Sequence, residues 1–109
     1  MASRQVKQSP VTRGIDEEYG YKFDLTGKVP SGTQSNAVNA IYLQASDGSF
    51  GSDLAGSLLD GTAAISSSIF TTQTFVQNAM TKYKRYKLEF GIDIDGKAWS
   101  WFVYIDTVD

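Results

Sequence analysis

The clearest pattern of hydrophobic and polar positions lies in the last quarter of the chain. Apolar and polar residues alternate strictly over Tyr86–Ile94, and a second stretch rich in apolar residues covers Lys97–Ile105. A period of two residues is typical of a strand with one buried face. Asp95-Gly96 between the two stretches is the dipeptide preferred in a type I′ turn, because both central residues then need positive φ. The sequence therefore predicts a C-terminal β-hairpin with a two-residue turn at Asp95-Gly96.

A two-residue turn also predicts which residues lie opposite each other. Pairing Ile94 with Lys97 couples apolar residues on one face, and a shift by one residue would destroy the match. The inward pairs are Ile92 with Trp99, Phe90 with Trp101, Leu88 with Val103 and Tyr86 with Ile105. The outward face then pairs Glu89 with Phe102 and Lys87 with Tyr104.

Weaker patterns predict further strands upstream. Tyr19–Thr26 alternates like a half-buried strand, and Val38–Ala45 has apolar residues on one face. Thr62–Val76 is rich in Ser, Thr, Ile and Phe, and we expect two short strands there, split near Phe70. Leu54–Leu59 fits either a short strand or one helical turn.

About seven short strands with frequent turn signals favour an all-β fold, a single-domain antiparallel two-sheet β-sandwich. The architecture expected is immunoglobulin-like, although the chain lacks the Cys…Trp…Cys pattern of antibody domains. Residues 1–18 are expected to form a polar N-terminal lead-in, and residues 19–109 the single domain.

Composition removes most familiar enzyme chemistry. The 109 residues include no Cys and no His, which excludes disulfides, thiolate metal sites, thiol nucleophiles and every His-dependent catalytic triad. We expect a binding or structural protein without a cofactor, a metal ion or a small-molecule substrate, and not an enzyme.

Charge and the N-terminal sequence bear on partners and location. Ten basic and twelve acidic residues give a net charge of −2, which argues against an obligate nucleic-acid binder. The N-terminus lacks the apolar stretch of a secretory signal peptide, and no apolar run is long enough to cross a membrane. We expect a soluble product made in a cytoplasm.

Two local motifs suggest specific chemistry. Asp93-Ile94-Asp95-Gly96 resembles part of a calcium loop, but its Gly stands at the fourth position and Tyr104 occupies the place of the terminal Glu. The hairpin turn accounts for the same residues. Lys82–Lys87 interleaves basic and aromatic residues, as in surfaces that bind nucleic acid. Docking of Lys84 and Arg85 onto an acidic protein partner is favoured over nucleic-acid contact, and the alternative is that these residues form the solvated entry to a strand.

The aromatic residues of the sheet divide by face. Trp99 and Trp101 could form a sugar-binding platform, but their register places them opposite Ile92 and Phe90, so core packing is favoured. Tyr42, Phe102 and Tyr104 are expected to point outward and to form a partner-binding surface. The alternative is that the N-terminal segment or neighbouring Lys stems cover this face.

The chain resembles a family of small immunoglobulin-like proteins of tailed bacteriophages and prophages, described as fibre–tail adaptor or neck proteins. The similarity extends from about Lys7 to Val108. The matching positions are Lys7, Pro10, Glu17 or Glu18, Tyr21-Lys22-Phe23-Asp24, Gly32-Thr33, Tyr86-Lys87-Leu88, Asp95-Gly96 and Val103-Tyr104-Ile105.

This resemblance implies a non-catalytic virion component that binds neighbouring tail, neck or fibre proteins, in several copies per particle. It would reside in the virion, or in the host bacterial cytoplasm before assembly. The alternative function is a carbohydrate-binding or adhesion β-sandwich that uses surface aromatic residues.

Overall fold

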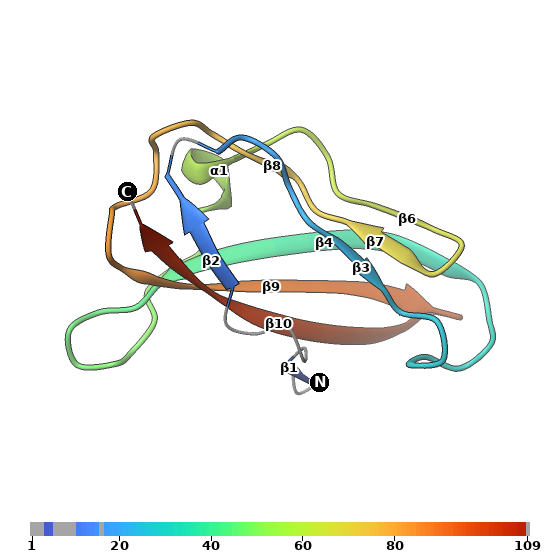
Figure 1. Cartoon of the computed structure of the whole chain (residues 1–109). Coiled ribbons are helices and arrows are strands. Elements are labelled where there is room, and N and C mark those ends of the chain that lie inside the picture. Colours follow the sequence, from blue (N-terminus) through green and yellow to red (C-terminus); the bar gives the residue numbers. More distant parts are fainter. Residues whose placement is uncertain (1–3, 6–10, 16, 109) are drawn as a thin grey trace.

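The computed structural model of the chain describes residues 4–5, 11–15 and 17–108. Most of these residues lie in β-strands, and there is one short helix, α1 (Ala55–Leu58). Figure 1 shows a broad layer made by the long strands β4, β9 and β10, and a second layer of short strands above it. The chain is therefore all-β, and its arrangement is compatible with a β-sandwich.

The main sheet is built around the predicted hairpin, which joins β9 (Arg85–Ile94) to β10 (Lys97–Val108). Lys97 lies opposite Ile94, and the antiparallel pairing continues along the whole of β9 in the predicted register. Asp95 and Gly96 have φ values of 51° and 83°, as a type I′ turn requires. The prediction of the hairpin and of its register is confirmed.

The other neighbour of β9 is β4 (Gln34–Leu43), which pairs with it antiparallel. The observed strand thus begins and ends earlier than the strand predicted at Val38–Ala45. The register shifts between Ser35 and Val38, and Asn36 in this interval has a φ of 55°. An extra residue in one strand, with one residue in the left-handed region, is a β-bulge.

The second layer consists of short pieces. Its strands are β3 (Lys22–Asp24), β6 (Ala64–Ser66) and β7 (Ile69–Thr71) in one sheet, and β5 (Leu59–Asp60) and β8 (Thr74–Phe75) in another. Of the strand predicted at Tyr19–Thr26, the middle residues Lys22–Asp24 form β3. The ambiguous Leu54–Leu59 stretch contains α1 and the start of β5.

The predicted break near Phe70 is wrong. Ser67 and Ser68 have φ values of 50° and 66° and form the turn between β6 and β7. Phe70 instead lies in the middle of β7, fully buried. Residues 62–76 therefore contain three strands, β6, β7 and β8. The turn between the first two lies two positions before Phe70, because two successive left-handed residues reverse the chain there.

The core lies between the two layers. Phe90 of β9 stacks on Phe23 of β3 with ring centroids 4.2 Å apart, and contacts Phe70 of β7 at 4.9 Å. Apart from Trp99, which is partly buried, the apolar residues predicted to face inward are almost completely buried: Tyr86, Leu88, Phe90, Ile92, Ile94, Trp101, Val103 and Ile105. Aromatic contacts of this kind add to the free energy gained by burying apolar area.

The N-terminal stretch expected to be a polar lead-in contributes strands to the main sheet. β1 (Arg4–Gln5) and β2 (Val11–Gly14) both pair with β10, and both run parallel to it. Arg13 of β2 is 1% exposed. The sheet is therefore mixed, and β10 is an internal strand with partners on both sides. In the part of the chain that the structure describes, no helix has the length and apolarity needed to cross a membrane.

Candidate functional site

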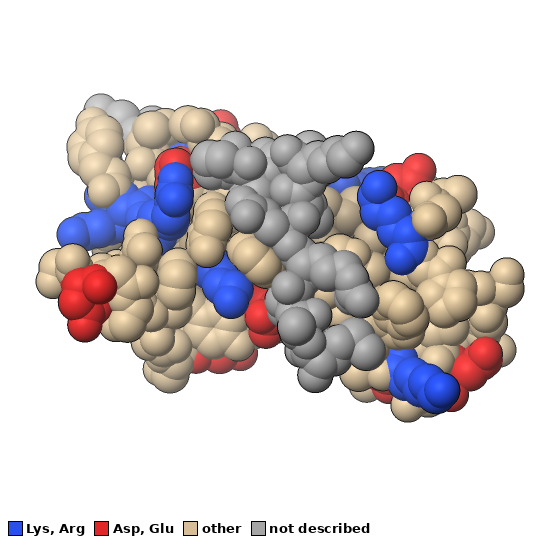
Figure 2. All heavy atoms as spheres, turned by 90° about the horizontal axis from the view of Figure 1, so that it is seen from below, with Lys and Arg blue, Asp and Glu red and all other residues tan. Residues whose placement is uncertain are grey.

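The candidate site is the outward face of the main sheet, the face turned away from the second layer. Figure 2 views the molecule from this side and shows charges of both signs among uncharged residues, several of them next to a charge of opposite sign. Alternation along β4 and β10 places the predicted partner-binding residues Tyr42, Phe102 and Tyr104 here, each partly exposed. Burial raises the pKa of Tyr42, with Glu89 and Asp53 acting in the same direction.

Three aromatic rings form a cluster on this face, which we call the outward aromatic cluster (Phe50, Phe102 and Tyr104). The centroids of Phe50 and Tyr104 are 6.0 Å apart with nearly parallel rings, and those of Phe102 and Tyr104 are 5.4 Å apart. Such partly exposed aromatic groups are enriched in protein interfaces.

Sequence reasoning missed Phe50, which lies outside any alternating stretch. It forms an isolated antiparallel bridge to Gln44, next to the end of β4. The turn at Asp47–Ser49 reverses the chain and returns Phe50 to the sheet; Ser49 N–H donates to Asp47 Oδ1 at 3.0 Å. The turn residues at 46–49 were the available signal, because a reversal there returns the next apolar residue to the end of the strand.

Cationic side chains cover the rings of the cluster. Lys87 Nζ lies 4.8 Å from the centroid of Phe102 and 5.9 Å from that of Phe50. The Arg85 guanidinium lies 5.0 Å from the centroid of Tyr104. These are cation–π distances. Lys87 Nζ also lies 3.7 Å from Glu89 Oε2, so this ammonium group interacts with a carboxylate as well as with the rings.

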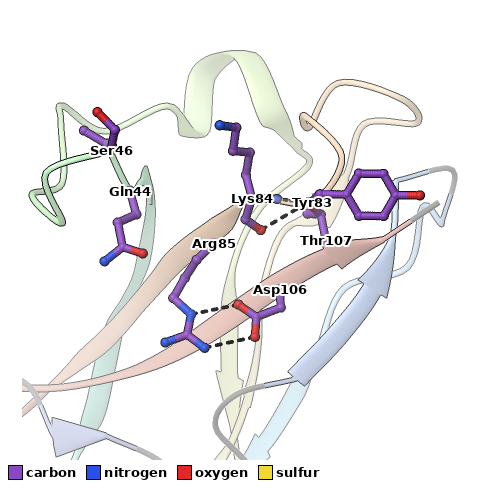
Figure 3. A pocket seen from close by; sticks show the side chains of 8 residues that line it. Gln44, Ser46, Tyr83, Lys84, Arg85, Asp106 and Thr107 are labelled. Carbon is purple, nitrogen blue, oxygen red and sulfur yellow. Dashed lines mark hydrogen bonds and ion pairs between the residues drawn. The ribbon is translucent and has the colours of Figure 1, made fainter.

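Lys84 and Arg85 were predicted to contact a partner together. Lys84 lies just before β9 and Arg85 is its first residue, and their side chains point in different directions (Figure 3). Arg85 points to the outward face, where its Nε and Nη2 donate to the two carboxylate oxygens of Asp106 at 2.7 and 3.0 Å. This pairing raises the pKa of Arg85 and lowers that of Asp106. Both residues line an open hollow of about 410 Å³ together with Gln44, Ala45, Ser46, Tyr83, Lys84 and Thr107.

The two tryptophans are placed differently. Trp101 is 4% exposed and packs against Phe90 with ring centroids 5.9 Å apart. Trp99 is partly buried and packs against the core cluster that contains Phe90 and Trp101. Core packing is therefore confirmed for Trp101, while Trp99 keeps some exposed surface.

The carboxylates around the hairpin turn are hydrogen-bonded to the chain itself. Asp95 Oδ1 accepts from Thr33 N–H at 3.0 Å, and Asp93 Oδ2 accepts from Asn36 Nδ2 at 3.2 Å. These bonds hold Thr33 and the start of β4 against the hairpin. Among the described residues, no three acidic, His or Cys side chains come together as metal ligands.

The outward face also contains a shallow hollow of about 210 Å³ around Gly91. Small residues on its outward lining are Val38, Ala40, Gly91, Ala98 and Ser100, with Glu89 and Asp93 at its margins. Val38 is 54% exposed. The outward aromatic cluster and this hollow thus occupy different parts of one sheet face. The alternative that the N-terminal segment covers the face concerns residues 1–3 and 6–10, which lie outside the described residues.

Comparison of the chain with protein-family models, with curated proteins and with solved structures gives no match.

Proposed function

We propose that the chain is a structural protein of a tailed-phage or prophage virion, of the fibre–tail adaptor or neck type, which acts by protein–protein assembly. In this proposal the fold is an immunoglobulin-like β-sandwich, and the outward face of its main sheet binds neighbouring virion proteins. Several copies per particle would strengthen weak individual contacts through multivalency.

The observation that carries the proposal is the outward aromatic cluster with its cationic cover. Its three rings lie on the far side of the sheet from the core. Aromatic residues and Arg are the residue types enriched at interface hot spots. Lys87 and Arg85 are already positioned over the rings, so an acidic partner would meet both charge and apolar area. The resemblance of the strand motifs to phage adaptor proteins supports the same class of function.

The test replaces Phe102 and Tyr104 together by Ser and follows incorporation into particles. Phage or tail-like particles from the organism that encodes the chain are separated on a density gradient, and the chain is quantified in the particle fraction. We expect the wild-type chain in that fraction and the double variant largely absent from it. Tyr83→Ser is the matched control, because Tyr83 is 71% exposed and outside the cluster.

Two results would contradict the proposal. One is absence of the wild-type chain from every particle fraction. The other is loss of the cooperative unfolding transition in the double variant, which would place both rings in the core.

The carbohydrate-binding alternative makes a different prediction. Glycan binding that disappears in Trp99→Ala, with the thermal unfolding transition unchanged, would favour that function over assembly. Trp101 is too deeply buried to stack on a sugar.

A further inference from the structure

The chain contains three Asp-Gly dipeptides, Asp47-Gly48, Asp60-Gly61 and Asp95-Gly96. In all three the glycine has a positive φ, between 82° and 88°. An aspartate followed by glycine is prone to isomerise, because a residue without a Cβ lets its nitrogen approach the preceding side chain. The structure separates the three dipeptides by where the carboxyl group and the glycine nitrogen are directed.

At Asp60 the glycine nitrogen faces the carboxyl group of the same dipeptide. Gly61 N–H donates to Asp60 Oδ1, with 2.9 Å between the two atoms. The Asp60 carbonyl oxygen accepts from Thr74 Oγ1 at 3.2 Å, and the Gly61 carbonyl oxygen accepts from Gln73 Nε2 at 2.8 Å. Because C=O and N–H point in opposite directions across a trans peptide, the bond from Thr74 helps to hold the Gly61 N–H on the side of the carboxyl group.

The surroundings of this dipeptide leave room for a ring to close. Asp60 and Gly61 are both exposed, and Asp60 is the last residue of β5. Beyond its own chain neighbours, no atom lies within 4 Å of the place that a Cβ on Gly61 would occupy. The carboxyl carbon and the nitrogen can therefore come together without displacing another group.

Asp47-Gly48 is held in an arrangement that opposes reaction. Gly48 N–H donates to the Ala45 carbonyl oxygen at 2.9 Å, so this nitrogen is committed to another acceptor. Asp47 Oδ1 accepts from the backbone N–H and the hydroxyl group of Ser49 at 3.0 and 2.6 Å. These bonds lower the pKa of Asp47. An ionised carboxyl group is a poor target, because the oxygen that leaves must be protonated.

Asp95-Gly96 is restrained by Thr33, which immediately precedes β4. Asp95 Oδ1 accepts from Thr33 N–H at 3.0 Å, and Asp95 N–H donates to the Thr33 carbonyl oxygen at the same distance. The carboxyl group is thus directed to Thr33. Of the three dipeptides, Asp60-Gly61 alone has the glycine N–H hydrogen-bonded to the adjacent aspartate among the interactions of the described residues.

We infer that Asp60-Gly61 is a site of spontaneous covalent modification, at which Asp60 becomes isoaspartate through a cyclic succinimide. Gly61 N loses its proton to water, and the remaining electron pair, directed along the former N–H bond, forms a bond to Asp60 Cγ. The bond from Cγ to the carboxyl hydroxyl group breaks, and this group leaves as water with the proton from the nitrogen. Water then opens the ring at either carbonyl carbon, giving aspartate or isoaspartate. One water is released and one is consumed, so no other reactant is needed.

The product changes the backbone beside the core. Isoaspartate adds one atom to the main chain and attaches the carboxylate directly to Cα. Asp60 pairs with Thr74 in the β5–β8 sheet, and the preceding pair is Leu59 with Phe75, both buried. Because the extra atom lengthens one strand of this pair, the modification loosens the β5–β8 sheet.

Ageing of the purified full-length chain at neutral pH tests the inference. Samples are digested with chymotrypsin, which cleaves after aromatic residues such as Phe50 and Phe70 and so separates the three dipeptides. Isoaspartate is quantified in each peptide by labelling with protein isoaspartyl methyltransferase and by mass spectrometry. In the folded chain we expect it at Asp60 about tenfold or more faster than at Asp47 and Asp95, because positioned groups react faster. In guanidinium chloride the three rates should become similar, since the distinguishing contacts are lost.

Two variants at the site and one control sharpen the test. Asp60→Glu should abolish the signal at position 60, because the longer side chain would have to close a slower six-membered ring. Asp60→Asn should raise it several-fold, because an amide forms the same succinimide with loss of ammonia and needs no protonated carboxyl group. Asp47→Glu is the matched control and should leave the signal at Asp60 unchanged. Thermal unfolding verifies that each variant folds.

Equal accumulation at the three aspartates of the folded chain, or faster accumulation at Asp47 or Asp95, would overturn the inference. An Asp60→Asn chain that reacts when unfolded but not when folded would overturn it too, because the fold would then protect the dipeptide. None of these results bears on particle incorporation, so the inference and the proposed function stand or fall separately.

Discussion

The guanidinium carbon of Arg13 lies 3.7 Å from the centroid of the Phe75 ring and 4.7 Å from the centroid of the Tyr19 ring. Arg13 Nη2 donates to the carbonyl oxygens of Glu17 and Tyr19. Its Nε and Nη1 are buried and have no hydrogen-bond partner among the described residues. Aromatic faces therefore supply much of the environment of this buried cation.

Arg13→Lys should destabilise the fold by about 2 kcal/mol. An ammonium group lacks the flat surface that stacks on Phe75 and the spread of donors that reaches two carbonyl groups. The measurement is the free energy of unfolding in urea. A lysine variant as stable as the wild type would show that the rings contribute little beyond apolar packing.

Gly91 should not tolerate even one added methyl group. A Cβ at this position would lie 2.6 Å from the Trp99 carbonyl oxygen, which belongs to the backbone of β10 and cannot move aside. Gly91→Ala should therefore cost about 2 kcal/mol of stability. Gly56→Ala in α1 is the matched control: no atom lies within 4 Å of its added Cβ, and it should be neutral or slightly stabilising. Equal melting temperatures for both variants would contradict the prediction.

The side chain of Thr107 in β10 forms hydrogen bonds with Thr81 and Lys84, which lie just before β9. Its buried Oγ1 donates to the Thr81 carbonyl at 2.6 Å and accepts from Lys84 N–H at 3.0 Å. Thr107→Val keeps the shape but leaves both backbone groups without this partner, at a cost of about 2 kcal/mol. Hydrogen exchange of the Lys84 amide should accelerate in the variant. Unchanged protection of that amide would exclude this role for the hydroxyl group.

The ion pair between Arg85 and Asp106 should give a small, pH-dependent contribution to stability. Arg85 lowers the pKa of Asp106 below its ordinary value of 3.8. The contribution is therefore present above that value and disappears as the pH falls through the lowered pKa. Because both side chains are 39% exposed, we expect about 0.5 kcal/mol or less.

Asp106→Asn provides the measurement for this pair. Urea unfolding of the variant and the wild type should differ slightly at pH 7 and converge at strongly acidic pH. A difference that grows as the pH falls would have the wrong sign for a carboxylate stabilised in its charged form.

The C-terminal hairpin could be predicted because its information is local. The alternation of β9 and β10 and the intervening Asp95-Gly96 lie within one short stretch, and together they determine the faces and the register. The outward positions of Phe102 and Tyr104 followed from the hairpin register, and that of Tyr42 followed from the pattern of Val38–Ala45. Ser67 and Ser68 were harder to interpret, because Ser has no intrinsic preference for the left-handed region that their turn requires.

The positions of β2, Arg13 and Phe50 depend on contacts between residues far apart in the sequence, and no local pattern could predict them. Val11–Gly14 reads as polar, and it becomes a strand because the free edge of β10 offers backbone hydrogen-bonding groups far along the chain. Arg13 is buried because Phe75 and Tyr19 enclose it, and an arginine in a polar stretch normally indicates exposure. Phe50 joins the outward aromatic cluster only after its loop folds back on the sheet.

The position of β10 also bears on the order in which the chain can fold as it is synthesised. β10 is the last strand along the sequence, and it supplies the pairing edge for β1, β2 and β9. Arg4 pairs opposite Trp101, so β1 cannot pair until β10, far later in the sequence, has been synthesised. Contacts of such large sequence separation make folding slow. Until β10 emerges, the apolar residues of β9 lack their partner strand, and this interval is when a nascent chain is most exposed to misassociation.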